Sequence, residues 1–148
     1  MAKKVEYWFD PFEGVEISGK IDKKAALEEI ADFLKTVILS DVSDGVSPVS
    51  GAKFPKLNKK YADTQKDGDR NPNLELSGDM LSSLIVRSSK GGILVTVPES
   101  EQEKADGHNN FSGKSNLPLR QFIPKKDESY EKYSSDIRSI IEDFIEEE

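Results

Sequence analysis

Residues 74–124, LELSGDMLSSLIVRSSKGGILVTVPESEQEKADGHNNFSGKSNLPLRQFIP, form the stretch around which we expect the rest of the chain to fold. Two runs within it, 84–89 and 93–97, are rich in apolar and β-branched residues, and glycines separate them. Such a pattern is typical of a β-hairpin. After these runs comes a polar segment that holds the only histidine and leads to residues 118–124, PLRQFIP.

The register of this hairpin follows from its hydrophobic pattern. A two-residue loop of Lys90 and Gly91 predicts five cross-strand pairs: Leu84 with Val97, Val86 with Val95 and Ser88 with Ile93 on one side, and Ile85 with Thr96 and Arg87 with Leu94 on the other. A loop of Gly91 and Gly92 would instead place Glu99 opposite Leu84. Because both loops contain Gly91, which tolerates positive φ, turn chemistry does not decide between them. The apolar face favours the first register.

Length and composition indicate one domain over residues 1–148, with a highly hydrated surface and a small hydrophobic core. The chain lacks cysteine, which excludes disulfides and thiolate metal sites and suits a reducing compartment. No apolar run approaches the roughly 20 residues of a membrane span, so we expect no membrane partner. The N-terminal residues lack the apolar segment of a signal peptide, and we expect none.

Charge is unevenly distributed along the chain. The net charge is −7, and residues 127–148 carry nine acids against two bases, so the remainder is neutral overall. Residues 53–70 carry six bases against three acids, which we interpret as a solvated face rather than a nucleic-acid site, because nucleic-acid readers usually show a concentrated basic footprint.

The N-terminal half predicts a strand and a helix. Alternating apolar residues in 5–9 predict a strand within an N-terminal arm, 1–20, and the short run 15–17 is expected to pair with it unless the arm is irregular. Apolar residues at three-to-four spacing predict a helix over 23–39, capped by Asp22, with Phe33 at the edge of its stripe. Residues 40–51 are expected to form a long surface loop, and 55–65 a short helix.

The C-terminal half predicts a long loop and a final helix. We expect residues 98–117 to be a loop, with His108 as a hydrogen-bonding surface residue, because no partner or pocket for general-base chemistry accompanies it. Aspartates near 41–44 and 63–69 lack the spacing of a calcium loop and are interpreted as turns. We therefore predict no catalytic, cofactor or metal residues. Asp127 is expected to cap an acidic helix over 127–148, whose last glutamates oppose the helix dipole.

The order of these segments resembles the virion-morphogenesis proteins of tailed bacteriophages, the tail-completion or head–tail joining group. The matching pieces, between Gly14 and Phe122, are in chain order Gly19 before the first helix, Ser47-Pro48-Val49-Ser50-Gly51, Phe54, Leu57, Tyr61, Lys66, Leu74, Leu76-Ser77-Gly78, Met80-Leu81, Ser83, the hairpin, Gly107-His108, Phe111-Ser112-Gly113 and Pro118-Leu119-Arg120-Gln121-Phe122. Two departures are Phe54, where the family usually carries tryptophan, and Lys104-Ala105-Asp106 before the histidine, where it commonly has an aromatic residue and an alanine. The acidic run 99–103 has no counterpart that we can place.

The resemblance implies a structural protein of the virion neck, present in the host cytoplasm before assembly, and not an enzyme. Its implied partners are copies of itself in a ring, commonly six-fold in such proteins, portal or head-completion proteins, and tail-tube or tail-terminator proteins, with genome DNA passing through without sequence-specific binding. We expect interface roles for His108, Phe111, Arg120 and Phe33, and a lumen-facing role for Glu146, Glu147 and Glu148, whose charge would repel DNA phosphates.

For Arg120 and Phe122 a second reading stays open: Phe122 fills the core, and Arg120 pairs with a carboxylate. Two other functional classes also stay open. The first is a small acidic binding module that antagonises a host nucleic-acid-binding protein, which competition with DNA for a basic partner would reveal. The second is a hydrolase with an atypical site at His108, which loss of turnover in His108→Ala would reveal. The fold we expect in all cases is α+β, with a small, mainly antiparallel sheet packed against the long first helix and the C-terminal helix.

Overall fold

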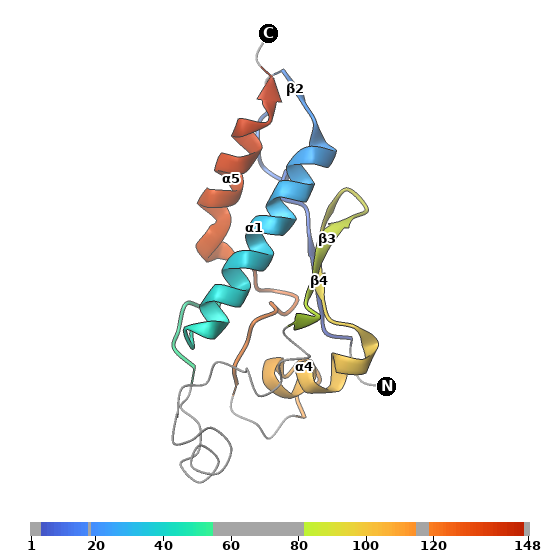
Figure 1. Cartoon of the computed structure of the whole chain (residues 1–148), viewed down its shortest axis with the longest axis vertical. Helices are drawn as coiled ribbons and strands as arrows, with labels where there is room; N and C mark the ends of the chain where they lie inside the picture. Colours follow the sequence, from blue (N-terminus) through green and yellow to red (C-terminus); the bar gives the residue numbers. More distant parts are fainter. Residues whose placement is uncertain (1–3, 18, 55–81, 115–118, 147–148) are drawn as a thin grey trace.

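A computed structural model describes residues 4–17, 19–54, 82–114 and 119–146, and it has the expected α+β architecture (Figure 1). The strands form an antiparallel three-stranded sheet of order β1-β4-β3, from β1 (Glu6–Phe9), β4 (Gly92–Thr96) and β3 (Ile85–Ser89), and a two-stranded sheet from β2 (Lys20–Ile21) and β5 (Ile145–Glu146). The helices are α1 (Lys23–Ser43), α4 (Gln102–Asn109) and α5 (Ser134–Asp143), with 3₁₀ turns η2 (Glu99–Glu101) and η3 (Glu131–Tyr133).

The β3–β4 hairpin has the register that the apolar face favours. Val86 lies opposite Val95 and Arg87 lies opposite Leu94, and the hairpin closes through Lys90 and Gly91. Both loop residues have positive φ, 51° and 76°, as a type I′ turn requires. This prediction is confirmed, and the buried face of the hairpin carries Ile93 and Val95, both fully buried.

The N-terminal strand is confirmed, but its predicted partner is wrong. Tyr7 and Phe9 are half-buried while Glu6 and Trp8 are exposed, as the alternation predicts. The strand pairs with β4, with Tyr7 opposite Val95, rather than with residues 15–17. The apolar β4 offers β1 a longer buried ladder than the short run 15–17 could, and the turn after β1 is closed by its own hydrogen bonds instead.

The first helix is confirmed and is longer than predicted. The Asp22 side chain accepts a hydrogen bond from the Ala25 backbone N–H at 3.1 Å, which is the expected N-cap. The helix continues to Ser43 because its last turn buries Val42 completely, which adds one more position to the apolar stripe. The predicted loop 40–51 is therefore shorter, and residues 46–53 form a compact turn with a Val46–Lys53 bridge. The predicted helix 55–65 lies outside the described residues.

The predicted long loop 98–117 is wrong over its first half. Residues 99–109 form η2 and then α4, which Figure 1 places at one end of the molecule. The helix has little apolar periodicity, and only Ala105 and Asn109 are buried on it. It is stabilised by side-chain hydrogen bonds to other segments rather than by an apolar stripe, which is why hydrophobic patterning did not reveal it.

The C-terminal helix is confirmed in position, but its bounds are wrong. Asp127 does not cap it, since the helix begins at Ser134 after a 3₁₀ turn, and it ends at Asp143. The chain then pairs with β2, with Ile145 opposite Ile21. This strand pairing satisfies backbone groups that a helix ending in glutamates would leave beside unfavourable charge. Helix α5 packs against α1, where the Tyr133 ring meets Phe33 edge-on at 5.9 Å between ring centroids.

Candidate interaction site

The only histidine lies in the last turn of α4 and is half-buried. Burial and, to a lesser extent, the positive charge of Arg120 together lower the pKa of His108 to about 4, so the imidazole is neutral at pH 7. Its Nδ1 atom is buried without a hydrogen-bond partner within the part of the chain that the structure describes. General-base chemistry needs an imidazole held by an orienting partner, and the charge that acts on this one is a cation.

Asn109, which sequence reasoning did not single out, is the centre of the local hydrogen-bond network. Its fully buried side chain donates from Nδ2 to the Ala105 carbonyl at 2.8 Å. Its Oδ1 accepts from the backbone N–H groups of Phe122 at 2.7 Å and Ile123 at 2.9 Å. The sequence signal is the pair Asn109-Asn110, because Asn110 has φ 55° and ends the helix in the left-handed conformation that asparagine tolerates.

Three of the predicted interface residues lie largely inside the protein. Arg120 is 6% exposed, and its backbone N–H donates to the His108 carbonyl at 3.0 Å. Phe111 and Phe33 are partly buried against the core. Phe122 is fully buried, in agreement with the reading in which it fills the core. A role for these residues in an interface stays a prediction.

Of the three predicted lumen residues, the structure describes the backbone of Glu146, which pairs with Lys20 at the end of the molecule away from α4 (Figure 1). Glu147 and Glu148 lie outside the described residues. Their lumen role stays a prediction.

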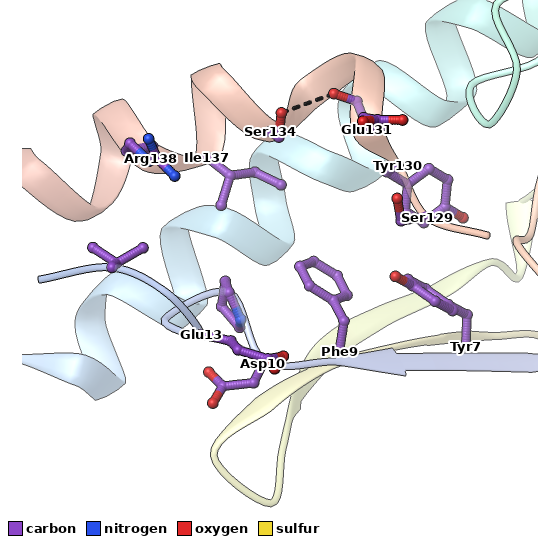
Figure 2. Close-up of a pocket in the computed structure, with 12 residues that line it drawn as sticks. Tyr7, Phe9, Asp10, Glu13, Ser129, Tyr130, Glu131, Ser134, Ile137 and Arg138 are labelled. Atoms are coloured by element: carbon purple, nitrogen blue, oxygen red, sulfur yellow. Dashed lines mark hydrogen bonds between the residues drawn. The ribbon is translucent and has the colours of Figure 1, made fainter. Parts of the chain in front are cut away.

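A groove of about 270 Å³ runs between β1 with the turn that follows it and the start of α5. Figure 2 shows Tyr7 and Phe9 rising from β1 toward Tyr130 and Ile137 on the opposite wall. The two β1 rings are stacked at 5.4 Å between centroids. The Tyr130 ring meets Tyr7 edge-on at 5.7 Å. Aromatic and aliphatic side chains thus form the apolar part of this groove.

Tyr130 is held rigidly at the end of the groove. It is 4% exposed, and its hydroxyl donates to the Phe122 carbonyl at 2.7 Å. Burial raises the pKa of Tyr130 well above its ordinary value, and the neighbouring Tyr7 raises it further, so the phenol stays protonated and keeps donating. The groove is therefore connected to the Asn109 network through Phe122, and its aromatic wall is fixed in place.

The rim of the groove is acidic. Asp10, Glu13 and Glu131 line it against a single cation, Arg138, and all four residues are exposed. Asp10 also accepts a hydrogen bond from the Phe12 N–H at 2.9 Å, which shapes the turn. Within the described residues, neither Glu13 nor Glu131 forms an ion pair. The rim thus carries an excess of two negative charges without internal compensation.

The described residues contain no group of three or more histidine or acidic side chains that could hold a metal ion. None of the helices in the described ranges has the length and apolarity that a bilayer crossing requires. Comparison with known proteins gives no match to any family model, curated protein or solved structure.

Proposed function

We propose that this chain is a structural protein of a tailed-bacteriophage virion, which forms or completes a ring at the head–tail junction. In this role it joins the tail to the capsid and lets DNA pass through. Before assembly it is present in the host cytoplasm. Its partners are copies of itself, in a six-fold ring, together with portal or head-completion proteins and tail-tube or tail-terminator proteins.

This proposal is supported by hydrogen bonds between segments that carry the resemblance to phage proteins. These segments are far apart in the sequence. The Ser47 hydroxyl donates to the Gln121 carbonyl at 2.8 Å, across 74 positions of the chain. The same hydroxyl accepts from the Val49 and Ser50 N–H groups, each at 3.2 Å. Within the later segments, Arg120 is tied to His108 by a backbone hydrogen bond of 3.0 Å.

These contacts give the pattern residues a structural task. Buried hydroxyl and amide side chains that satisfy backbone groups fix one arrangement of the chain, and losing one leaves a buried polar group unpaired. Residues that hold the chain in one arrangement support a structural role better than a catalytic role. A scaffold of this kind suits a protein that works by fitting against neighbours.

A closed ring needs a head-to-tail interface made by two different surfaces of each subunit. The chain has distinct surfaces at its two ends, α4 at one end and the β2–β5 sheet at the other (Figure 1). The acidic C-terminal segment continues from the second surface. Facing the lumen, these carboxylates would repel the phosphates of the genome and reduce its adhesion to the wall.

The lumen role is tested by the triple variant Glu146→Gln, Glu147→Gln and Glu148→Gln in assembled particles. Removing three like charges from every subunit should slow DNA ejection, because phosphates would no longer be repelled. The control is Glu28→Gln with Glu29→Gln, two exposed positions of α1. Ejection kinetics equal to those of the unmodified particle would count against a lumen position for these residues.

The junction role is tested by cosedimentation. The purified chain is mixed with isolated tails or with filled capsids, separated on a gradient, and quantified in each particle fraction. We expect saturable binding to one of the two particles and a stable joined particle when both are present. A chain that stays at the top of the gradient in every mixture would refute the proposal.

A further inference from the structure

We propose that the groove beside β1 binds an extended segment of a partner protein that carries lysine or arginine, and that this segment adds to β1 as a further strand. The inference rests on the open edge of the sheet, the aromatic lining of the groove and the charge of its rim. It goes beyond the junction role, because it names the chemistry of one partner segment whatever particle that partner belongs to.

The backbone of β1 has an open edge whose groups can be identified. The two-residue hairpin loop closes on a hydrogen-bonded pair, Ser89 with Gly92, and such pairs alternate along an antiparallel ladder. Gly92, Leu94 and Thr96 therefore point their backbone groups at β3, while Ile93 and Val95 point theirs at β1. On β1, Tyr7 and Phe9 complete those bonds.

A side-chain amide confirms this alternation. The Val5 N–H donates to Gln102 Oε1 at 2.6 Å, and Gln102 Nε2 donates to the Val97 carbonyl at 3.0 Å. The amide thus bridges Val5 to the residue that would be its next partner on β4. It follows that the N–H and C=O groups of Glu6 and Trp8 point the other way, to an edge with which no other strand of the described chain pairs.

The open edge of β1 favours a strand over a helix. A helix uses its backbone N–H and C=O groups in its own hydrogen bonds, so only an extended segment can pair with the outward-pointing backbone groups of Glu6 and Trp8. A strand on the open edge would leave its backbone outside the groove and send alternate side chains into it. The groove has room for such side chains above Tyr7 and Phe9 (Figure 2).

The chemistry of the groove selects cationic side chains. The long methylene stems of lysine and arginine pack on apolar surface while their charged ends stay in water, and both cations are attracted by aromatic faces. Here the stems would lie against the Tyr7 and Phe9 rings, and the charged ends would reach the carboxylates of Glu13 and Glu131. The fold already holds one such pair nearby, with Lys23 Nζ at 5.2 Å from the centre of the Phe12 ring.

The test titrates the peptide Ac-Lys-Val-Lys-Val-Lys-NH2 into the ¹⁵N-labelled chain and follows backbone amide resonances. We expect saturable shifts at Glu6 and Trp8, and slower hydrogen exchange of these two amides once the peptide is bound. Two control peptides separate the contributions. The same peptide with every backbone amide N-methylated keeps the charge and removes strand pairing, and Ac-Glu-Val-Glu-Val-Glu-NH2 keeps the backbone and reverses the charge. Neither control should bind.

A pair of double variants tests the rim. Glu13→Gln with Glu131→Gln should weaken binding about three- to thirtyfold, as expected for losing two partly solvated ion pairs. Glu28→Gln with Glu29→Gln, which changes the net charge equally on exposed positions of α1, should leave affinity unchanged. The proposal is overturned if the lysine peptide gives no saturable shift at Glu6 and Trp8. It is equally overturned if the N-methylated peptide binds as well, or if both double variants weaken binding alike.

Discussion

Replacing Asn109 by alanine should remove a large part of the stability of this fold. The substitution deletes the acceptor for the Phe122 and Ile123 N–H groups and the donor to the Ala105 carbonyl. Phe122 and Ile123 are fully buried, so water cannot simply replace the lost acceptor. The hydrogen bond from the Arg120 N–H to the His108 carbonyl would remain between this segment and α4.

The expected loss of unfolding free energy follows from the two buried N–H groups that would lose their acceptor. A buried donor left unsatisfied costs about 1–3 kcal/mol, so two of them give a loss of about 2–6 kcal/mol, and we expect about 3–5. A small domain has a free energy of unfolding of about 5–15 kcal/mol. With an m-value of about 1.5 kcal/mol/M, the urea midpoint should fall by about 2–3 M.

The assay is equilibrium urea unfolding followed by the fluorescence of Trp8, the single tryptophan of the chain, and by circular dichroism. The matched control is Thr36→Ala, which also removes one side-chain hydrogen bond to a backbone carbonyl, at an exposed site of α1. The control should change stability by less than about 0.5 kcal/mol. A loss below about 1 kcal/mol for Asn109→Ala, with an unchanged m-value, would refute the central place of this side chain.

Three further substitutions test other parts of the fold. Gly92→Ala should cost about 1–3 kcal/mol of unfolding free energy and shift Trp8 emission, because a Cβ there would lie 2.4 Å from the Phe9 carbonyl oxygen and 2.5 Å from the indole; unchanged emission and stability would contradict this packing. Asp22→Ala should cost about 1 kcal/mol through loss of the helix cap, and no change in urea midpoint would exclude the cap. His108→Gln should reduce the stability lost between pH 7 and pH 5 in urea titrations, because the unfolded chain takes up a proton near pH 6.5 that the folded imidazole, with a pKa of about 4, does not. Parallel pH curves for the two proteins would contradict the buried neutral imidazole.

The parts of the fold that sequence reasoning anticipated are those where burial repeats with a regular period. The hairpin register and the Asp22-capped helix both follow from apolar positions that recur every two, or every three to four, residues. The pairing of β1 with β4 joins segments that lie far apart in the chain. Tyr7 and Val95, for example, are 88 positions apart, and spacing within either segment does not specify that they pair.

The parts that sequence reasoning missed depend on polar side chains whose partners are distant in the chain. Helix α4 has only two buried positions, and it is tied down by Gln102 and Asn109 through bonds to Val5 and Phe122. The groove beside β1 combines rings from the N-terminal strand with residues from 129–138. Neither the hydrogen bonds of α4 nor the lining of the groove produces a pattern within one segment of the sequence. Predicting them requires knowing which distant segments come into contact.

The oligomeric state of the chain, alone and mixed with isolated tails or filled capsids, is the most direct test of a ring at the head–tail junction. Native mass spectrometry, applied to the free chain and to the neck complex released from joined particles, measures it. We expect six copies of the subunit, as a closed six-fold ring requires, in the complex from joined particles. A chain that remains a single copy in every sample, or one found only in complex with a small molecule, would contradict it.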